Sequence, residues 1–178
     1  MSEPARVLLA DPPWRFGDKL PGNGRGAVKH YACLSVPQLM RFPLPSLADD
    51  CLLLLWRVAS MQQEALDVAR AWGFTVKSEI VWEKMTRTGK QHFGMGRYVR
   101  ASHETCLVAT RGRVKVADRG IRSRFSAPVG EHSEKPDRIY EIAEALVPGG
   151  PFVELFARRV REGWMQRGNE LPKRRRAA

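Results

Sequence analysis

The feature that most constrains the fold of this chain is the uninterrupted apolar run Cys51-Leu52-Leu53-Leu54-Leu55-Trp56. The stretches Val7 to Ala10 and Phe152 to Phe156 are apolar almost throughout. Runs of this kind, without polar alternation, are typical of strands buried on both faces in sheets that helices cover. Thr75 to Trp82 and Thr105 to Thr110 are two further predicted strands.

Three segments between these strands have the apolar spacing of helices. The first follows Ser35 as N-cap and has Pro37 in its first turn. The second follows a predicted capping box of Ser60 and Gln63, and the third opens at Pro136. The side chains predicted to face inward are Leu39, Met40, Phe42, Met61, Ala65, Val68, Ala69, Trp72, Ile139, Ile142, Ala143 and Leu146. This alternation predicts a three-layer α/β domain with a mostly parallel sheet.

Length and composition restrict the class of protein. The 178 residues fit a single domain, residues 1–178. The sequence contains neither a membrane span nor a signal sequence, so we expect a cytoplasmic protein without a membrane partner. Cys33, Cys51 and Cys106 form no C-x-x-C pair, and the four histidines lack ligand spacing. We therefore expect reduced thiols and no metal.

The formal net charge of +11 is unevenly distributed along the chain. Residues 84–130 contain eleven basic and two acidic residues, and residues 158–178 contain eight basic and two acidic ones. Dense basic segments usually neutralise phosphates, so residues 84–130 are predicted to hold a nucleic acid. For the basic tail, residues 171–178, nucleic-acid binding and a merely solvated surface both remain open.

Asp11-Pro12-Pro13-Trp14 directly follows the first apolar run. Both prolines lack an N–H, so their carbonyls and the Asp11 carboxylate form a rigid group of acceptors. Such a group suits an exocyclic amine, and Trp14 is in position to stack on an aromatic base. The alternative is an ordinary strand exit with a Pro-Pro turn. No G-x-G-x-x-G or P-loop follows any strand, which disfavours a dinucleotide held in the usual way.

Collinear landmarks along the chain carry a family resemblance. Besides Asp11 to Trp14 they are Lys29-His30-Tyr31, Leu55-Trp56, Ala71 to Phe74, Trp82-Glu83-Lys84, Gly94 to Arg97, Arg100, His103-Glu104, His132 to Pro136, Glu154 to Arg158, Gly163-Trp164 and Gly168-Asn169-Glu170. In order and spacing they resemble the DPPW-type adenine-N6 methyltransferases, in particular the small bacterial and phage members. The family's usual proline after the strand arginine is replaced here by Arg159.

The resemblance implies a Rossmann-like methyltransferase fold with circularly permuted motifs, the catalytic motif N-terminal and the cofactor motif C-terminal. It implies S-adenosyl-L-methionine as cofactor, and a catalytic role for Asp11, Pro12, Pro13 and Trp14. The implied cofactor-binding residues are Asp11, Lys135, Glu154, Phe156, Arg158, Asn169 and Glu170. The implied substrate-binding residues are Lys29, His30, Tyr31, Lys84, Arg97, Arg100 and Glu104.

The chemistry of adenine suits these roles. Its amine is a poor nucleophile because the lone pair is delocalised into the ring, and hydrogen bonds to Asp11 and the Pro12 carbonyl would favour a pyramidal nitrogen. An unpaired carboxylate at Glu154 would be costly within an apolar strand, so a ligand hydroxyl or Arg158 is expected to satisfy it.

Several functions remain open at this stage. The expected reaction is methylation of adenine in duplex DNA, with the base flipped out. Whether the enzyme acts as a monomer or a homodimer remains open. The alternatives are an RNA adenine-N6 methyltransferase and an inactive nucleic-acid-binding subunit. Methylation of a protein amide is disfavoured by Asp11, Trp14 and the basic segment.

Overall fold

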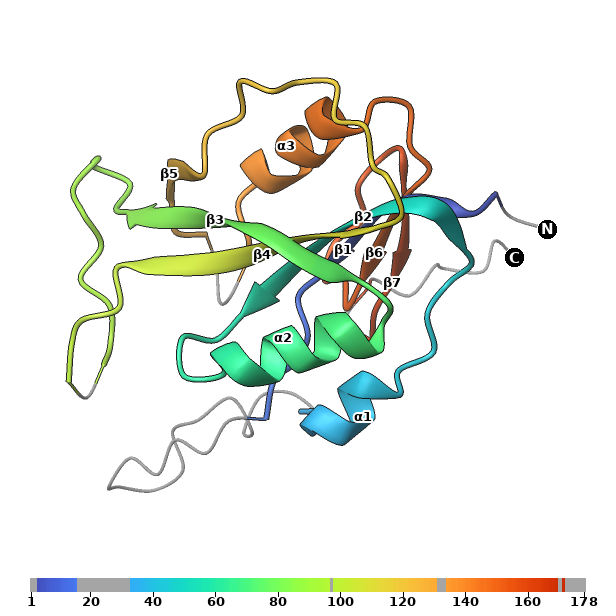
Figure 1. Ribbon diagram of the computed structural model, residues 1–178. Helices are drawn as coiled ribbons and strands as arrows, with labels where there is room; N and C mark the ends of the chain where they lie inside the picture. The colour runs from blue at the N-terminus through green and yellow to red at the C-terminus, as the bar shows by residue number, and fades with distance from the viewer. Residues whose placement is uncertain (1–2, 16–32, 97, 131–133, 170, 172–178) are drawn as a thin grey trace, which may run out of the picture.

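The described part of the chain forms one sheet with helices on both faces. The computed structural model describes residues 3–15, 33–96, 98–130, 134–169 and 171. Its strands are β1 Ala5–Ala10, β2 Leu47–Arg57, β3 Thr75–Met85, β4 His103–Arg111, β5 Arg124–Pro128, β6 Phe152–Leu155 and β7 Trp164–Arg167. Its helices are α1 Val36–Met40, α2 Gln62–Ala71 and α3 Arg138–Leu146. Figure 1 shows α3 on one face and α1 and α2 on the other, which confirms the three-layer prediction.

The strand order is β5-β3-β4-β2-β1-β6-β7. β1 lies parallel to both β2 and β6, β6 to β7, and β3 to β5, so the sheet is mostly parallel, as predicted. β4 is antiparallel to β2 and β3. A direct return of the chain after β3, without a helical crossover, produces this reversal.

The run Cys51 to Trp56 is buried on both faces of the sheet, as the sequence predicts. Leu53 and Leu55 pack toward α1 and α2, whereas Leu52, Leu54 and Trp56 pack toward α3. All five are 1% exposed or less. Complete burial of such side chains contributes about 1.5–3 kcal/mol each, which fixes β2 in the middle of the domain.

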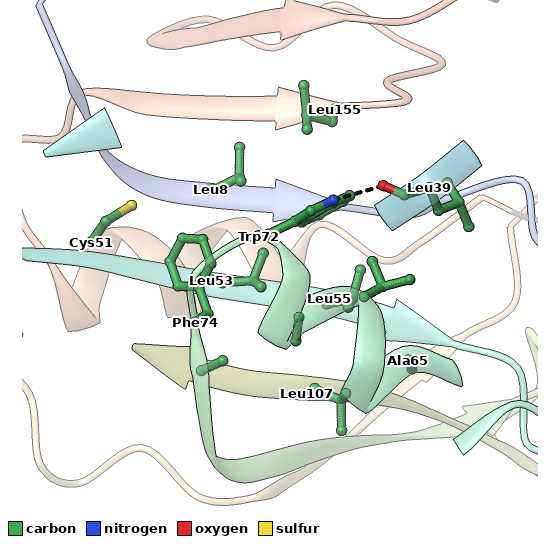
Figure 2. Close-up of a cluster of buried hydrophobic side chains, with 14 of the residues drawn as sticks. Leu8, Leu39, Cys51, Leu53, Leu55, Ala65, Trp72, Phe74, Leu107 and Leu155 are labelled. Atoms are coloured by element: carbon green, nitrogen blue, oxygen red, sulfur yellow. Dashed lines mark hydrogen bonds between the residues drawn. The ribbon is translucent and has the colours of Figure 1, made fainter. Parts of the chain in front are cut away.

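The cluster under α1 and α2 also joins the two helices (Figure 2). The indole N–H of Trp72, at the end of α2, donates to the carbonyl of Leu39 in α1 at 2.8 Å. Gly73 has a φ of 84°, a left-handed conformation that ends α2 where the sequence predicts.

Three details of the predicted helices are wrong. The N-cap of α2 is Met61, not Ser60, and Gln63 bonds Asp67 at 3.0 Å instead of forming a capping box. Met40 is 39% exposed because it follows the buried Leu39 by 100° around a short helix. α3 begins at Arg138, two residues after Pro136. Its predicted inward residues are all buried.

Strands β5 and β7 are absent from the sequence prediction. Both lie at the edges of the sheet, and their burial alternates instead of being continuous. Of the helices among the described residues, none has the length and apolar character needed to cross a membrane.

Candidate active site

The site is built around the carboxyl end of β1. Ala10, the last residue of β1, pairs with Leu55 of β2 on one side and Leu155 of β6 on the other. The residues that directly follow Ala10, Leu55 and Leu155 in the sequence are Asp11, Trp56 and Phe156. In parallel sheets ligands bind beyond these strand ends, so the register by itself brings the three residues to one crevice.

The Asp11 to Trp14 segment is held rigidly by backbone hydrogen bonds. The Pro12 carbonyl accepts from the Trp14 N–H at 2.8 Å, and the Pro13 carbonyl accepts from the Leu34 N–H at 2.9 Å. Each carbonyl has two lone pairs, so the Pro12 oxygen can still accept a second hydrogen bond. The segment is therefore preorganised.

Trp14 does not offer its ring to a ligand. The side chain is 3% exposed and belongs to the core, and its indole N–H donates to the Trp56 carbonyl at 3.0 Å. This corrects the expectation that Trp14 stacks on an adenine. A large aromatic ring at the strand exit is stabilised more by burial than by an open face. Its role is to hold Asp11-Pro12-Pro13 against the end of β2.

Four charged side chains form a chain of ion pairs beside Asp11. The Lys135 Nζ lies 2.8 Å from Asp11 Oδ2 and 3.2 Å from Glu104 Oε2. Glu104 also pairs with Lys84, whose ammonium lies 5.3 Å from the centre of the Trp82 ring. Sequence reasoning allowed an exposed Lys135 before a helix, but its side chain is only 14% exposed. The order Asp11, Lys135, Glu104, Lys84 alternates in sign.

Burial and ion pairing act in opposite directions on this chain. Burial alone lowers the pKa of Lys135, but the carboxylates of Asp11 and Glu104 outweigh it and raise that pKa above its ordinary value. Burial alone raises the pKa of Glu104, but Lys135 and Lys84 outweigh it and lower that pKa. Both groups therefore stay charged at neutral pH, and the Lys135 ammonium also lies 5.4 Å from the centre of the Trp56 ring.

Glu154 is satisfied by neutral side chains. Its Oε1 accepts from the Tyr140 hydroxyl at 2.9 Å, and its Oε2 accepts from the Gln166 amide at 2.6 Å. This corrects the expectation that Arg158 or a ligand must satisfy it. Burial raises the pKa of Glu154, and the two hydrogen bonds oppose that shift. A carboxylate has about four lone-pair sites, so Glu154 retains capacity for a ligand hydroxyl.

Phe156, the residue after β6, has a φ of 62°. A non-glycine residue in this left-handed region costs on the order of 1–2 kcal/mol. Its ring packs on Phe42, with ring centres 4.7 Å apart. Strain of this kind concentrates at functional sites, and here it lies next to Asp11.

The remaining predicted residues are not all gathered at this crevice. Arg158 is half-buried beyond β6, Asn169 is exposed after β7, and Arg100 is exposed with its guanidinium 5.0 Å from the centre of the Phe93 ring. Five predicted residues lie outside the described part of the chain: Lys29, His30, Tyr31, Arg97 and Glu170. Within that part, no group of three or more His, Cys, Asp and Glu side chains is arranged to hold a metal.

The sequence profile of the MT-A70 family matches residues 5–170, nearly the whole chain. The chain belongs to this family. Two animal relatives have names that state adenosine methylation or its catalytic subunit. The N(6)-adenosine-methyltransferase MT-A70-like protein of Drosophila melanogaster is 31% identical over 174 residues, which are 93% of this chain and 26% of that protein. The catalytic subunit METTL3 of Homo sapiens is 31% identical, with 93% and 28% covered.

A bacterial relative is closer to this MT-A70 chain in length. The type II methyltransferase M.MunI of a Mycoplasma species is 29% identical over 188 residues, which are 94% of this chain and 78% of that protein. The chain thus spans about a quarter of the length of the two animal relatives but most of M.MunI. The family resemblance found in the sequence is confirmed.

Several residues of this MT-A70 site are absent from the sequence prediction. In the sequence, Trp56 is only a landmark of the family resemblance, although its place near the end of β2 puts it beside Asp11. Tyr140 and Gln166 satisfy Glu154, but neither has a local sequence signal, because they belong to different elements.

Proposed function

We propose that this protein transfers a methyl group to the exocyclic N6 amine of adenine in DNA, with S-adenosyl-L-methionine as methyl donor. The observation that carries the proposal is the ion pair of Asp11 with Lys135 at the preorganised end of β1. The names of the adenosine methyltransferase relatives support the reaction, and the length shared with M.MunI supports a compact enzyme.

The residues present suit both reactants. Asp11 accepts one hydrogen of the amine, and the second lone pair of the Pro12 carbonyl accepts the other, which localises the nitrogen lone pair. When bound, S-adenosyl-L-methionine would supply an electrophilic methyl group for the amine, with its thioether as the leaving group that keeps the C–S electron pair. Asp11 and Glu154 would be the carboxylates available to the cationic cofactor, and Arg158, half-buried beyond β6, would be the residue to pair with its carboxylate.

Proton removal needs no strong base before transfer. The amine becomes acidic only as it gains the methyl group, so its proton leaves late, to Asp11 or water. Lys135 holds the Asp11 carboxylate in one orientation, with the Lys135 Nζ 2.8 Å from Asp11 Oδ2. Positioning thus supplies much of the acceleration.

The nucleic acid is proposed to lie along residues 84–130. This segment has ten basic residues in the described part of the chain. Nine of them are exposed, and Lys84 is partly buried. The loop between β3 and β4 begins at the ion-pair chain, since the Lys84 N–H donates to the Ser102 carbonyl at 2.9 Å. In Figure 1 this loop extends away from the sheet. Its sequence from 85 to 103 has no acidic residue.

Large apolar side chains on the same loop are also open to solvent. Phe93 is 76% exposed, Met95 82% and Val99 79%. Gly94 permits the loop to close, because a Cβ there would lie 2.0 Å from the Ala101 carbonyl oxygen. Exposed apolar groups beside basic ones suit contact with nucleotide bases and phosphates together.

Label transfer tests the reaction and substrate. Purified protein is incubated with methyl-labelled cofactor and sequence-matched duplex DNA, single-stranded DNA and RNA, and the products are digested to nucleosides. Label in N6-methyldeoxyadenosine supports the proposal, whereas label only in RNA replaces DNA as the substrate. Absence of both transfer and cofactor binding by calorimetry indicates an inactive subunit, since a scaffold need not bind the cofactor. Asp11→Ala should abolish transfer.

Salt dependence of binding tests the surface. Arg87→Gln with Arg100→Gln should reduce the slope of log K against log salt by about 1.8 for duplex DNA, about 0.9 for each lost phosphate contact. The matched control, Arg41→Gln with Lys77→Gln, removes two exposed charges outside this segment. Equal slopes for the two double variants contradict the assigned surface. Light scattering tests the proposed homodimer, which a monomeric mass with full activity would remove.

A further inference from the structure

Arg159 contacts the segment that carries Lys135. Its Nη1 donates to Glu134 Oε1 at 2.7 Å, and its Nη2 donates to Asp137 Oδ1 at 2.6 Å and to the Lys135 carbonyl at 3.3 Å. The guanidinium is planar and presents its donors in a fixed fork. One side chain therefore fixes three groups on a four-residue stretch.

This stretch has little other regular support. Residues 134–136 are neither helix nor strand, and α3 begins only at Arg138. Lys135 has a long, flexible side chain, yet its ammonium must remain 2.8 Å from Asp11. The position of the Lys135 backbone therefore decides whether the ion pair forms.

Arg159 also reaches the residues around Glu154. Its guanidinium lies 5.5 Å from the centre of the Tyr140 ring, and Tyr140 donates to Glu154. The Arg159 carbonyl accepts from the Gln166 amide at 2.7 Å, and the same amide donates to Glu154. The turn after β6 is thus joined both to the Lys135 segment and to the Glu154 cluster.

We propose that Arg159 is a positioning residue that fixes the Lys135 backbone, so that Lys135 holds Asp11 in its reactive orientation. The effect on transfer rests on the proposed methyltransferase function. A proline, which the family resemblance leads one to expect at this position, has no group to make these contacts. The contacts of Arg159 with the Lys135 segment therefore depend on the arginine that this chain has in place of the expected proline.

Arg161 provides a matched control. It is similarly buried, with its side chain 25% exposed against 33% for Arg159. It also lies over Tyr140, at 4.6 Å, but it pairs mainly with Glu144 at 3.1 Å and reaches Asp137 only at 3.4 Å. Among the described residues, Arg161 makes no hydrogen bond or ion pair with Glu134 or Lys135.

The first test measures Lys135 directly and needs no turnover. Folded wild type, Arg159→Ala and Arg161→Ala are acetylated under limiting reagent, and labelling is quantified by mass spectrometry with the exposed Lys77 as internal reference. Arg159→Ala should raise the relative labelling rate of Lys135 by about tenfold, since a partnered, buried amine becomes accessible. Arg161→Ala should leave it unchanged. Unchanged Lys135 labelling in folded Arg159→Ala overturns the proposal.

The second test is kinetic. Arg159→Ala should lower kcat by about tenfold, because the displaced Lys135 no longer holds Asp11 in its reactive orientation. Arg159→Lys should recover part of the loss, while Arg161→Ala keeps the wild-type kcat. If labelling rises but kcat does not fall, the positioning role is refuted. A wild type that transfers nothing refutes the proposed function instead. In that case the labelling result alone tests whether Arg159 fixes the position of Lys135.

Discussion

Replacing Lys135 by Met removes the cation between two carboxylates while keeping the length of the side chain. The Asp11 and Glu104 side chains are 20% and 29% exposed, so they cannot simply move their charge into water. Breaking a buried pair from one side costs about 3–5 kcal/mol. Because Glu104 keeps Lys84 as a partner, we expect the lower end, about 3 kcal/mol in the free energy of unfolding at pH 7.

The loss should depend on pH in a defined direction. Lys135 and Lys84 lower the pKa of Glu104 against the effect of burial, so pairing of Glu104 contributes stability above its unfolded pKa. That contribution disappears as pH falls through the lower folded pKa. At the alkaline end, the raised pKa of Lys135 keeps its contribution until pH rises through that folded value. The difference between wild type and Lys135→Met should therefore be full at pH 7 and shrink in acid.

Urea unfolding, followed by tryptophan fluorescence from pH 7 down to about 3.5, measures this difference. Lys77→Met, which removes an exposed lysine from β3, is the control. A cycle with Glu104→Gln isolates the direct coupling, expected at about 1–3 kcal/mol. An equal loss for Lys135→Met at every pH, or a loss no larger than that of Lys77→Met, refutes the ion-pair explanation.

Three further predictions concern the backbone and the core. Trp14→Phe should cost about 1 kcal/mol more than Trp56→Phe in urea unfolding, because the Trp14 indole donates a hydrogen bond, whereas the Trp56 indole N–H has no acceptor among the described residues; equal costs contradict this. Gly168→Ala should destabilise by about 1–3 kcal/mol in thermal unfolding, since its Cβ would lie 2.0 Å from the Ala157 carbonyl oxygen; a neutral effect would show that the turn adapts. Phe156→Gly should be about 1 kcal/mol more stable than Phe156→Ala by calorimetry, because the φ of 62° strains alanine but not glycine; the reverse order contradicts the assigned strain.

The central strands could be predicted from sequence because their burial is written into consecutive residues. Cys51 to Trp56 has no polar position, so it can only lie between two covered faces. The edge strands β5 and β7 could not be predicted in this way. They are short and half solvated, and their pairing depends on neighbouring strands far away in sequence.

The same difference between local and long-range information applies to the residues of the site. The sequence by itself determined that Asp11 ends a buried strand and that the next two residues are rigid, because these properties are local. It suggested Lys135 and Glu104 only through the family resemblance. No local rule relates Lys135 to Asp11, which lies 124 positions earlier in the chain.

Only the tertiary structure decided which charges meet. The register of β1 with β2 and β6 places Trp56 and Phe156 beside Asp11, and the packing of α3 against β6 gives Glu154 its Tyr140 partner. The tertiary structure also buries the Trp14 side chain in the core. Ion pairs and hydrogen bonds act over about 3 Å, so their partners are chosen by the fold that brings distant segments together, not by their spacing along the chain.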